Sequence, residues 1–302
     1  MTSASEALPA ARRWRDRGPL PLATVLLALL VIWYAAAVWL NAPQVIDIAF
    51  RDKPEWTTRD LVAATWAMER PILPAPHQIA IDFYESVFWQ EIDSRRSLLY
   101  HASVTAAATL VGFVFGIVLG VLLAIGIVHV QTLDRSLLPW IIASQTIPIL
   151  AIAPMIIVVL GNIGFTGLLP KAIISMYLCF FPVAIGMVKG LRSPDPLQLD
   201  LMRTYSASPA QVLWKLRGPA SVPFLFASLK VAIGISLVGA IVGELPTGAQ
   251  EGIGARLLSG SYYGQTVQIW SALVMAALLG VILVAIVTLA ERATLRFMGA
   301  QP

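Results

Sequence analysis

Long apolar runs separated by short polar segments form the main pattern of this sequence. Six runs are long enough to cross a bilayer, which takes about 20 apolar residues per helix. In lipid, a helix satisfies its own backbone hydrogen bonds. The pattern therefore predicts an all-α, polytopic integral membrane protein with transmembrane helices at residues 20–40, 102–128, 137–160, 168–189, 222–244 and 266–290.

The first apolar run follows a polar tail, residues 1–19, that carries four arginines. A cleavable signal peptide is the alternative interpretation, because the alanines at 35–37 have the small side chains of a cleavage site. The run has about 21 residues, whereas the apolar region of a signal peptide has about 7 to 15. Its length favours an uncleaved span.

The distribution of charge predicts the orientation of the chain. Basic residues concentrate in the tail and in the loop at 190–221, and Arg292 and Arg296 lie at the start of the C-terminal tail at 293–302 and within it, whereas residues 41–98 hold nine acidic and six basic residues. Cytoplasmic segments are rich in Lys and Arg, so we expect the loop and both termini in the cytoplasm. The segment 41–101 then lies outside, with short amphipathic helices, and residues 102–292 form a five-helix core.

Composition narrows the class of protein. Hydrophobic residues make up 58% and charged residues 13% of the chain, about half the usual 25% charged share of a soluble domain. A net charge of +4 spread over several loops does not favour a nucleic-acid partner. The chain has one cysteine, Cys179, and no nucleotide-binding P-loop motif or hydrolase motif. We expect neither catalytic residues nor a metal site.

Three glycines at every fourth position mark the second span. Gly112, Gly116 and Gly120 form a stripe on one helix face, and small residues let two helices approach closely in lipid. The stripe predicts helix packing within one subunit, with a dimer face as the alternative.

Prolines interrupt the third span. Pro148 follows the polar residues Ser144, Gln145 and Thr146, and each interior proline frees a backbone carbonyl. Such carbonyls are tolerated at membrane depth where they face protein or a water-filled cavity. The two interpretations are a packed structural kink and a translocation pathway lined by these four residues.

Two charged residues lie in or at the end of the fifth span. Lys230 is expected to extend to the nearby interface, with an ion pair as the alternative. Glu244 is either an interfacial residue in water or part of an outer gate. As a gate, it would hold the glycine-rich segment 245–265, expected to form turns, through Arg256 or through backbone N–H groups.

The polar segment between the fourth and fifth spans predicts a short amphipathic helix, with Ser208 as N-cap and Pro209 after it. Its apolar stripe can rest on lipid headgroups, on the protein's own spans or in a groove of a cytosolic partner. The partner is favoured, because we expect no surface of this chain to cover the stripe, which comprises Leu201, Tyr205, Val212, Leu213 and Leu216.

This segment resembles the cytoplasmic "EAA" loop of permease subunits of ATP-binding-cassette importers. Residues 200–202 stand in the Glu-Ala-Ala places, Ser206 in the Gly place and 218–219 in the Leu-Pro places. The stretches ILPAPHQIAIDFYE and VPFLFASLKVAIGISLVGAIVGEL resemble segments of the nitrate, sulfonate and taurine branch. The resemblance covers about residues 72–298.

The resemblance implies a permease in a bacterial inner membrane, with residues 41–101 in the periplasm. It implies a second permease subunit (an identical copy or a close paralogue), two cytosolic ATPase subunits that bind ATP and Mg, and a periplasmic binding protein. The solute would be a sulfonate- or nitrate-like anion or a pyrimidine-type heterocycle. The ATPase-coupling residues would be Asp200, Arg203, Tyr205, Ser206, Ala207, Ser208, Val212, Leu213, Lys215, Leu216 and Pro219.

Two other classes remain open at this point. An ion-gradient-driven secondary transporter or channel works alone and usually has buried charged groups in mid-span, which are scarce here. A membrane scaffold protein does not transport a solute, so it would not need a broken third span.

Overall fold

The computed structural model describes residues 19–51, 55–246 and 251–299, and all their regular elements are helices. The expected cytoplasmic tails at 1–19 and 293–302 lie largely or partly outside these residues. The chain divides into two compact units. The first comprises residues 1–84 and 263–271, and the second comprises residues 85–262 and 272–302.

The first unit is built on α2 (Pro19–Ala49), which extends nine residues beyond the predicted end of the first span. The short helices α3 (Thr58–Trp66) and α4 (Pro76–Tyr84) follow it. The fully buried Asn41 joins α2 to the extended chain before α4, because its side chain binds the backbone of Ile72 and Leu73. A buried amide side chain that is paired in this way fixes the path of an irregular segment.

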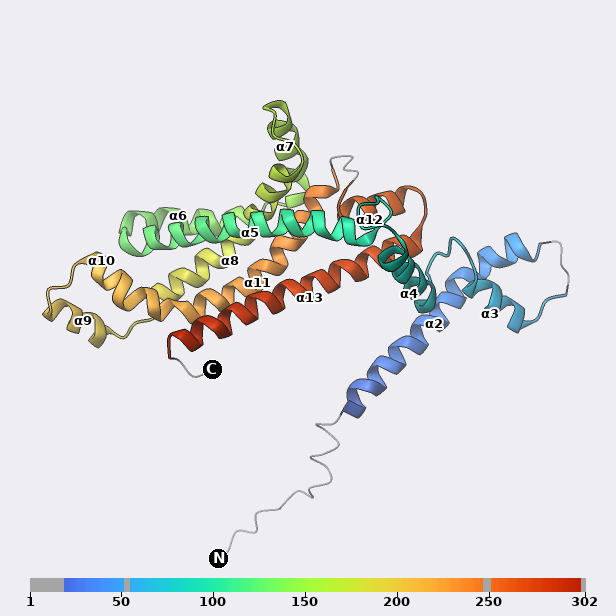
Figure 1. The fold of residues 1–302 in the computed structure, drawn as a ribbon, viewed down its shortest axis with the longest axis horizontal. Coiled ribbons are helices and arrows are strands. Elements are labelled where there is room, and N and C mark those ends of the chain that lie inside the picture. Colours follow the sequence, from blue (N-terminus) through green and yellow to red (C-terminus); the bar gives the residue numbers. More distant parts are fainter. Residues whose placement is uncertain (1–18, 52–54, 247–250, 300–302) are drawn as a thin grey trace, which may run out of the picture. The chain divides into compact units, whose positions relative to one another are not determined.

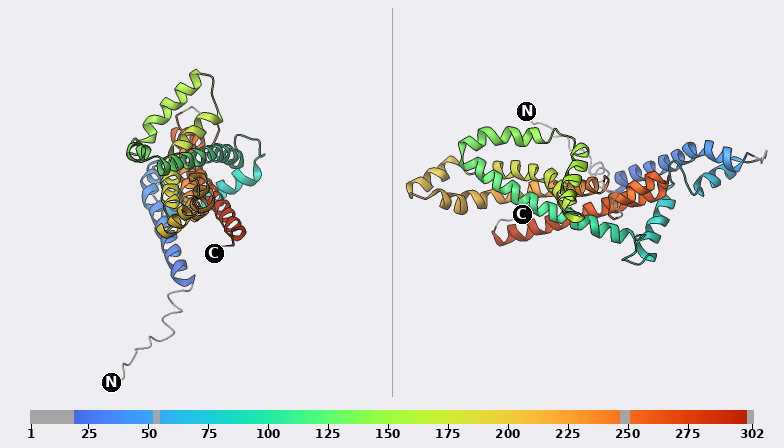
Figure 2. Two further views of the ribbon diagram at one scale, coloured as in Figure 1. Left: turned by 90° about the vertical axis from the view of Figure 1, so that its left-hand side faces the viewer. Right: turned by 90° about the horizontal axis from the view of Figure 1, so that it is seen from above.

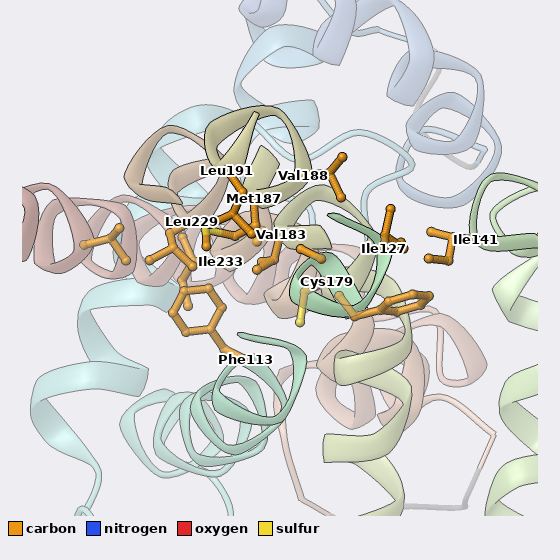
Figure 3. Close-up of a cluster of buried hydrophobic side chains, with 14 of the residues drawn as sticks. Phe113, Ile127, Ile141, Cys179, Val183, Met187, Val188, Leu191, Leu229 and Ile233 are labelled. Atoms are coloured by element: carbon orange, nitrogen blue, oxygen red, sulfur yellow. The ribbon is translucent and has the colours of Figure 1, made fainter. Parts of the chain in front are cut away.

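Three long helices form the centre of the second unit. They are α5 (Leu98–His129), α8 (Leu168–Leu191) and α11 (Gly218–Glu244), and α8 packs against both of the others (Figure 1). Figure 3 shows their shared apolar core, in which Phe113, Val183 and Ile233 lie close together. Helix α13 (Thr266–Phe297) begins in the first unit and supplies Leu283 and Val287 to this core.

The glycine stripe of α5 lies directly against α8. A Cβ atom on Gly112 would lie 2.5 Å from the Ala172 carbonyl, and one on Gly116 would lie 2.2 Å from Cys179 Sγ. At Gly120 it would lie 2.9 Å from the Phe180 carbonyl. Each distance is too short for a real Cβ, so the close approach of the two helices requires these glycines.

The predicted spans agree with the helices, with two differences. Among the described residues, five helices are long and apolar enough to cross a membrane, and a bent pair makes six if counted as one span. The third span was predicted to start at residue 137, but α6 (Gln131–Ser144) begins earlier, and Val130 alone separates it from α5. Asp134 favours this early start, since it lies in the positive first turn of the helix.

The second difference concerns the segment 245–265, which was expected to form only turns. It contains the helix α12 (Ile253–Tyr262). Its many glycines favoured turns, but side chains from α5 and α11 hold the first turn of this helix.

Lys230 is paired, contrary to the favoured prediction. Its Nζ lies 2.5 Å from Glu291 Oε2, which joins α11 to α13. Burying a charge in lipid is costly unless it is paired. The partner is 61 residues away in sequence, so local spacing gave no sign of the ion pair.

Candidate functional site

Three features of the second unit bear on function, and two of them lie at opposite ends of α11. The helices α9 (Pro196–Thr204) and α10 (Pro209–Val212) precede α11, and α12 follows it. Figure 1 shows α9 and α10 at one end of the long helices and α12 toward the other, and the right-hand view of Figure 2 shows the gold α9–α10 segment at its end of the bundle. A helix of 27 residues is about 40 Å long, which is long enough to cross the hydrocarbon core of a bilayer.

The loop between α8 and α11 is a capped pair of short helices. Asp195 and Gln198 form a capping box at the start of α9, and Ser208 and Gln211 form one at the start of α10. Each box satisfies backbone donors that the helix leaves free. The prediction of Ser208 as an N-cap with Pro209 after it is confirmed. The π-helical turn η2 (Leu213–Arg217) continues α10 into α11.

Ser206 makes the turn between the two short helices. Its φ angle is +51°, and among the described residues it is the one non-glycine residue with a positive φ. An L-residue pays about 1–2 kcal/mol for this left-handed conformation. The strain explains why the resemblance aligns this position with a glycine.

We predict that Ser206→Gly stabilises the turn by about 0.5–1 kcal/mol, because glycine adopts a positive φ without a steric cost. Amide hydrogen exchange of residues 201–208 should slow several-fold. Ser208→Gly is the matched control, and it should speed exchange at the start of α10, because it removes the capping hydroxyl. Faster exchange in the Ser206→Gly protein would contradict this account of the turn.

The exposed side chains of this loop differ from the expected stripe. Tyr205 is 76% exposed and Leu201 is 56% exposed, as predicted, whereas Trp214 at 75% was not counted in the stripe. Leu213 instead packs against the apolar core of its own unit. The expectation that the stripe has no surface of this chain to cover it is therefore wrong for Leu213. The π-helical turn changes the residues per turn, so a 3.6-residue period assigns Leu213 and Trp214 to the wrong faces.

The other residues that the resemblance assigns to ATPase coupling lie on the same loop. Arg203 and Asp200 form an exposed ion pair of 2.9 Å. Arg217 donates to the Leu191 carbonyl and ties η2 to the end of α8. Among the remaining aligned residues, Ser208, Lys215 and Pro219 are exposed, and Ala207, Val212 and Leu216 are half-buried.

The third feature is the break in the third span. Ser144 ends α6, Pro148 caps α7 (Ile149–Asn162), and the two helix axes differ in direction by 98°. Gln145 is half-buried and Thr146 is exposed between them. The hydroxyl of Tyr177 on α8 donates to the Ser144 carbonyl, so the break is held by a specific contact. A bend of 98° is also far larger than a simple proline kink.

A buried carboxylate joins α12 to the ends of three long helices. Glu244 is fully buried, and its carboxylate accepts hydrogen bonds from the Thr105 hydroxyl at 2.9 Å and the Gly254 N–H at 2.8 Å. Lys171 Nζ lies 4.0 Å from Glu244 Oε1 and donates to the Glu251 carbonyl at 3.1 Å. The interpretation of Glu244 as an interfacial residue in water is wrong. The expected backbone N–H partner is present.

The same cluster holds the first turn of α12 at two more points. The Ile253 N–H donates to Thr105 Oγ1 at 2.9 Å, and the Gly252 N–H donates to His101 Nδ1 at 3.0 Å. Since Nδ1 accepts, His101 Nε2 carries the proton and donates to the Arg95 carbonyl at 2.8 Å. We call Glu244, Thr105, Lys171 and His101 the clasp.

Three members of the clasp were not among the candidate site residues of the sequence. His101 is 2% exposed, Lys171 is 7% exposed and Thr105 is fully buried. The sequence held one signal for this cluster. Lys171 and Glu244, a basic and an acidic residue, lie at the same end of the fourth and fifth spans.

The fold is that of an all-α polytopic membrane protein. The short helices α9 and α10 lie at one end of α11, and the clasp lies at the other end. A model of the family described as "Binding-protein-dependent transport system inner membrane component" matches residues 116–297. The match spans more than half of the chain, so this protein belongs to that family. It is a transport permease and not an enzyme.

Curated relatives agree with this membership. The chain is 32% identical over 61% of its length to the formylaminopyrimidine transport permease protein of Halalkalibacterium halodurans, of which 68% is covered. It is 30% identical over 75% of its length to the riboflavin transport system permease protein of Chloroflexus aurantiacus, covering 80% of that protein. It is 25% identical over 76% of its length to a putative aliphatic sulfonates transport permease protein of Bacillus subtilis, covering 79% of that protein.

Family membership has two direct consequences. A permease component of such an importer works with an ATPase and a binding protein, in the inner membrane. The alternatives of an ion-gradient-driven carrier and of a scaffold protein are therefore not supported.

Proposed function

We propose that this chain forms half of a translocation pathway for a small polar solute. An identical copy or a close paralogue supplies the other half, and two cytosolic ATPase subunits bind ATP and Mg. The chain's lack of a P-loop motif supports this division of labour. The termini and the loop at 190–221 face the cytoplasm, as their basic residues favour.

The observation that carries the proposal is the exposed surface formed by Leu201, Tyr205 and Trp214. Two capped helices present these large side chains at the end of the bundle that carries the basic loop. Aromatic side chains on a rigid support are typical of interface hot spots. We propose that this surface docks in a groove of the ATPase, with Arg203 and Lys215 at its polar rim.

The solute is proposed to be a flat heterocycle of the pyrimidine type. The support is the order of identities, because the formylaminopyrimidine and riboflavin permeases share 32% and 30% with this chain. A sulfonate-like anion is the second candidate, supported by 25% identity to the sulfonate permease.

An uptake assay tests the solute class. The permease is reconstituted with its ATPase and binding protein in vesicles that contain ATP, and radiolabelled formylaminopyrimidine is supplied outside. We expect uptake that excess riboflavin or pyrimidine competes away and that taurine leaves unchanged. Competition by taurine alone would reverse the choice of solute class.

We further propose that Ser144, Gln145, Thr146 and Pro148 border the pathway. The bend of 98° interrupts the helical backbone between α6 and α7, and Thr146 is exposed there. Irregular backbone inside a membrane is stable where it lines a cavity or another protein surface. Helix α7 beyond the bend exposes Leu150, Met155 and Val158, an apolar face that suits lipid or the second permease.

Cysteines at Gln145 and Thr146, in a Cys179→Ser background, should react with small polar thiol reagents. We expect their reaction rates to differ at least several-fold between nucleotide-free and ATP-bound complexes, because the pathway opens to one side at a time. A cysteine at Val158 on α7 is the control for exposure to lipid, and it should stay unreactive. Unreactive cysteines at both test positions in every state would assign the bend a structural role only.

A further inference from the structure

The polar clasp is a large part of what attaches α12 to the long helices. Ile253 is the one large apolar side chain of α12 that is fully buried, and its other buried residues are Gly254, Ala255 and Gly260. Leu257 and Leu258 are half-buried. A segment with few buried apolar contacts opens at a low free-energy cost. Its attachment therefore depends strongly on the hydrogen bonds of the clasp.

The clasp binds three consecutive N–H groups, those of residues 252 to 254. The first turn of a helix leaves such donors free, and here side chains from α5 and α11 take all three. Residue 252 must be glycine, because its φ is +113° and a Cβ there would lie 2.2 Å from the Glu244 carboxyl carbon. These three hydrogen bonds and the close contact at Gly252 therefore fit a single position of α12 against α5 and α11.

Glycines with positive φ flank α12 on both sides. Gly252 precedes it, and Gly264, with φ +65°, follows it with open space around its Cβ position. Gly264 is therefore required by its backbone conformation and not by crowding. Glycines at both ends of a rigid element are suited to hinge motion, since they absorb large changes in φ and ψ.

Buried charge in the clasp indicates a switch more than a stability device. Glu244 and Lys171 are almost completely buried, and replacing such a pair by apolar residues is often neutral or stabilising. A cavity of about 310 Å³ beside Lys171, lined also by Ser103, Ala107 and Gly167, leaves room for the ammonium group to move. The pair can therefore separate without a clash.

We propose that α12 is a gate at the outer end of the pathway and that the clasp is the latch that keeps it shut. This inference rests on the proposed function, and it adds that the binding protein docks on the side opposite to the ATPase. Docking and ATP binding release the latch, and α12 swings on its flanking glycines. By linkage, a latch that favours the closed gate disfavours the ATP-bound, outward-open complex by the same factor.

Two matched pairs of variants test the latch. Thr105→Val removes the hydroxyl that joins Ile253 to Glu244, whereas Thr109→Val removes a hydroxyl that bonds only within α5. Glu244→Gln weakens the charged hydrogen bonds, whereas Glu91→Gln makes the same change in an exposed side chain of the same unit, before α5 begins. Each pair makes the same chemical change inside and outside the clasp.

The measurement is ATP hydrolysis by the whole complex in nanodiscs, with and without the binding protein. We expect Thr105→Val and Glu244→Gln to raise the basal rate about tenfold, since a charged hydrogen bond is worth about that factor. Thr109→Val and Glu91→Gln should match the parent. Parental basal rates in both clasp variants, with normal assembly, would overturn the latch.

Hydrogen exchange in the unaltered complex keeps the test independent of folding defects. The amides of residues 252 to 254 should be protected at rest and exchange at least tenfold faster when ATP and the binding protein are present. Equal protection in both states would overturn the latch by itself. Failure of the proposed function has a different signature, because the parent complex would then show no stimulation by any binding protein.

Discussion

Replacing Trp214 with aspartate is expected to separate the permease from its ATPase while leaving the permease folded. The indole is 75% exposed on the loop between α8 and α11, so its removal costs the free subunit little. An aromatic hot spot contributes about 2 kcal/mol or more to an interface, which is about a thirtyfold change in affinity. The amount of ATPase that copurifies with the permease should fall by about that factor.

Leu213→Asp is the matched control for this prediction. Leu213 packs against the core of its own unit, so a carboxylate there should lower the thermal stability of the isolated permease. The two neighbouring positions thus separate docking from folding. Full ATPase binding and ATP-dependent uptake by the Trp214→Asp complex would show that the docking surface lies elsewhere.

Replacing Gly116 with valine is expected to prevent assembly of the second unit. A Cβ at this position would lie 2.2 Å from Cys179 Sγ and 3.3 Å from the Phe180 backbone nitrogen. Overpacking a rigid contact costs about 1–3 kcal/mol, and here α5 and α8 must separate along their shared face. We expect no monodisperse subunit after purification in detergent.

Gly234→Val provides the comparison, because a Cβ on Gly234 meets no atom within 4 Å. That variant should elute and melt like the parent protein. If Gly116→Val behaves in the same way, the glycine stripe is not a packing contact and the α5–α8 interface described here is wrong.

Local sequence patterns predicted the features that depend on local chemistry. The apolar runs located the long helices, because a lipid-spanning helix needs a set length of apolar residues. Ser208 was assigned as a cap from its own side chain and Pro209, and the structure confirms it. The break at Pro148 followed from the missing N–H group of proline.

Features that depend on distant pairing could not be predicted. Thr105 and Glu244 are 139 residues apart, and Lys230 and Glu291 are joined only by the packing of α11 on α13. Helix α12 was missed for a related reason, since its first turn is completed by side chains from other helices. Trp214 was missed because a π-helical turn changes the period along the loop.

The energy source of transport distinguishes an ATP-driven permease from an ion-gradient-driven carrier. Vesicles that carry the permease, its ATPase and its binding protein are given labelled formylaminopyrimidine, with ATP or with an imposed proton or sodium gradient. We predict uptake with ATP that persists when ionophores collapse the gradients and that stops when the ATPase's P-loop lysine is replaced. Uptake driven by a gradient without ATP or the ATPase would contradict the account.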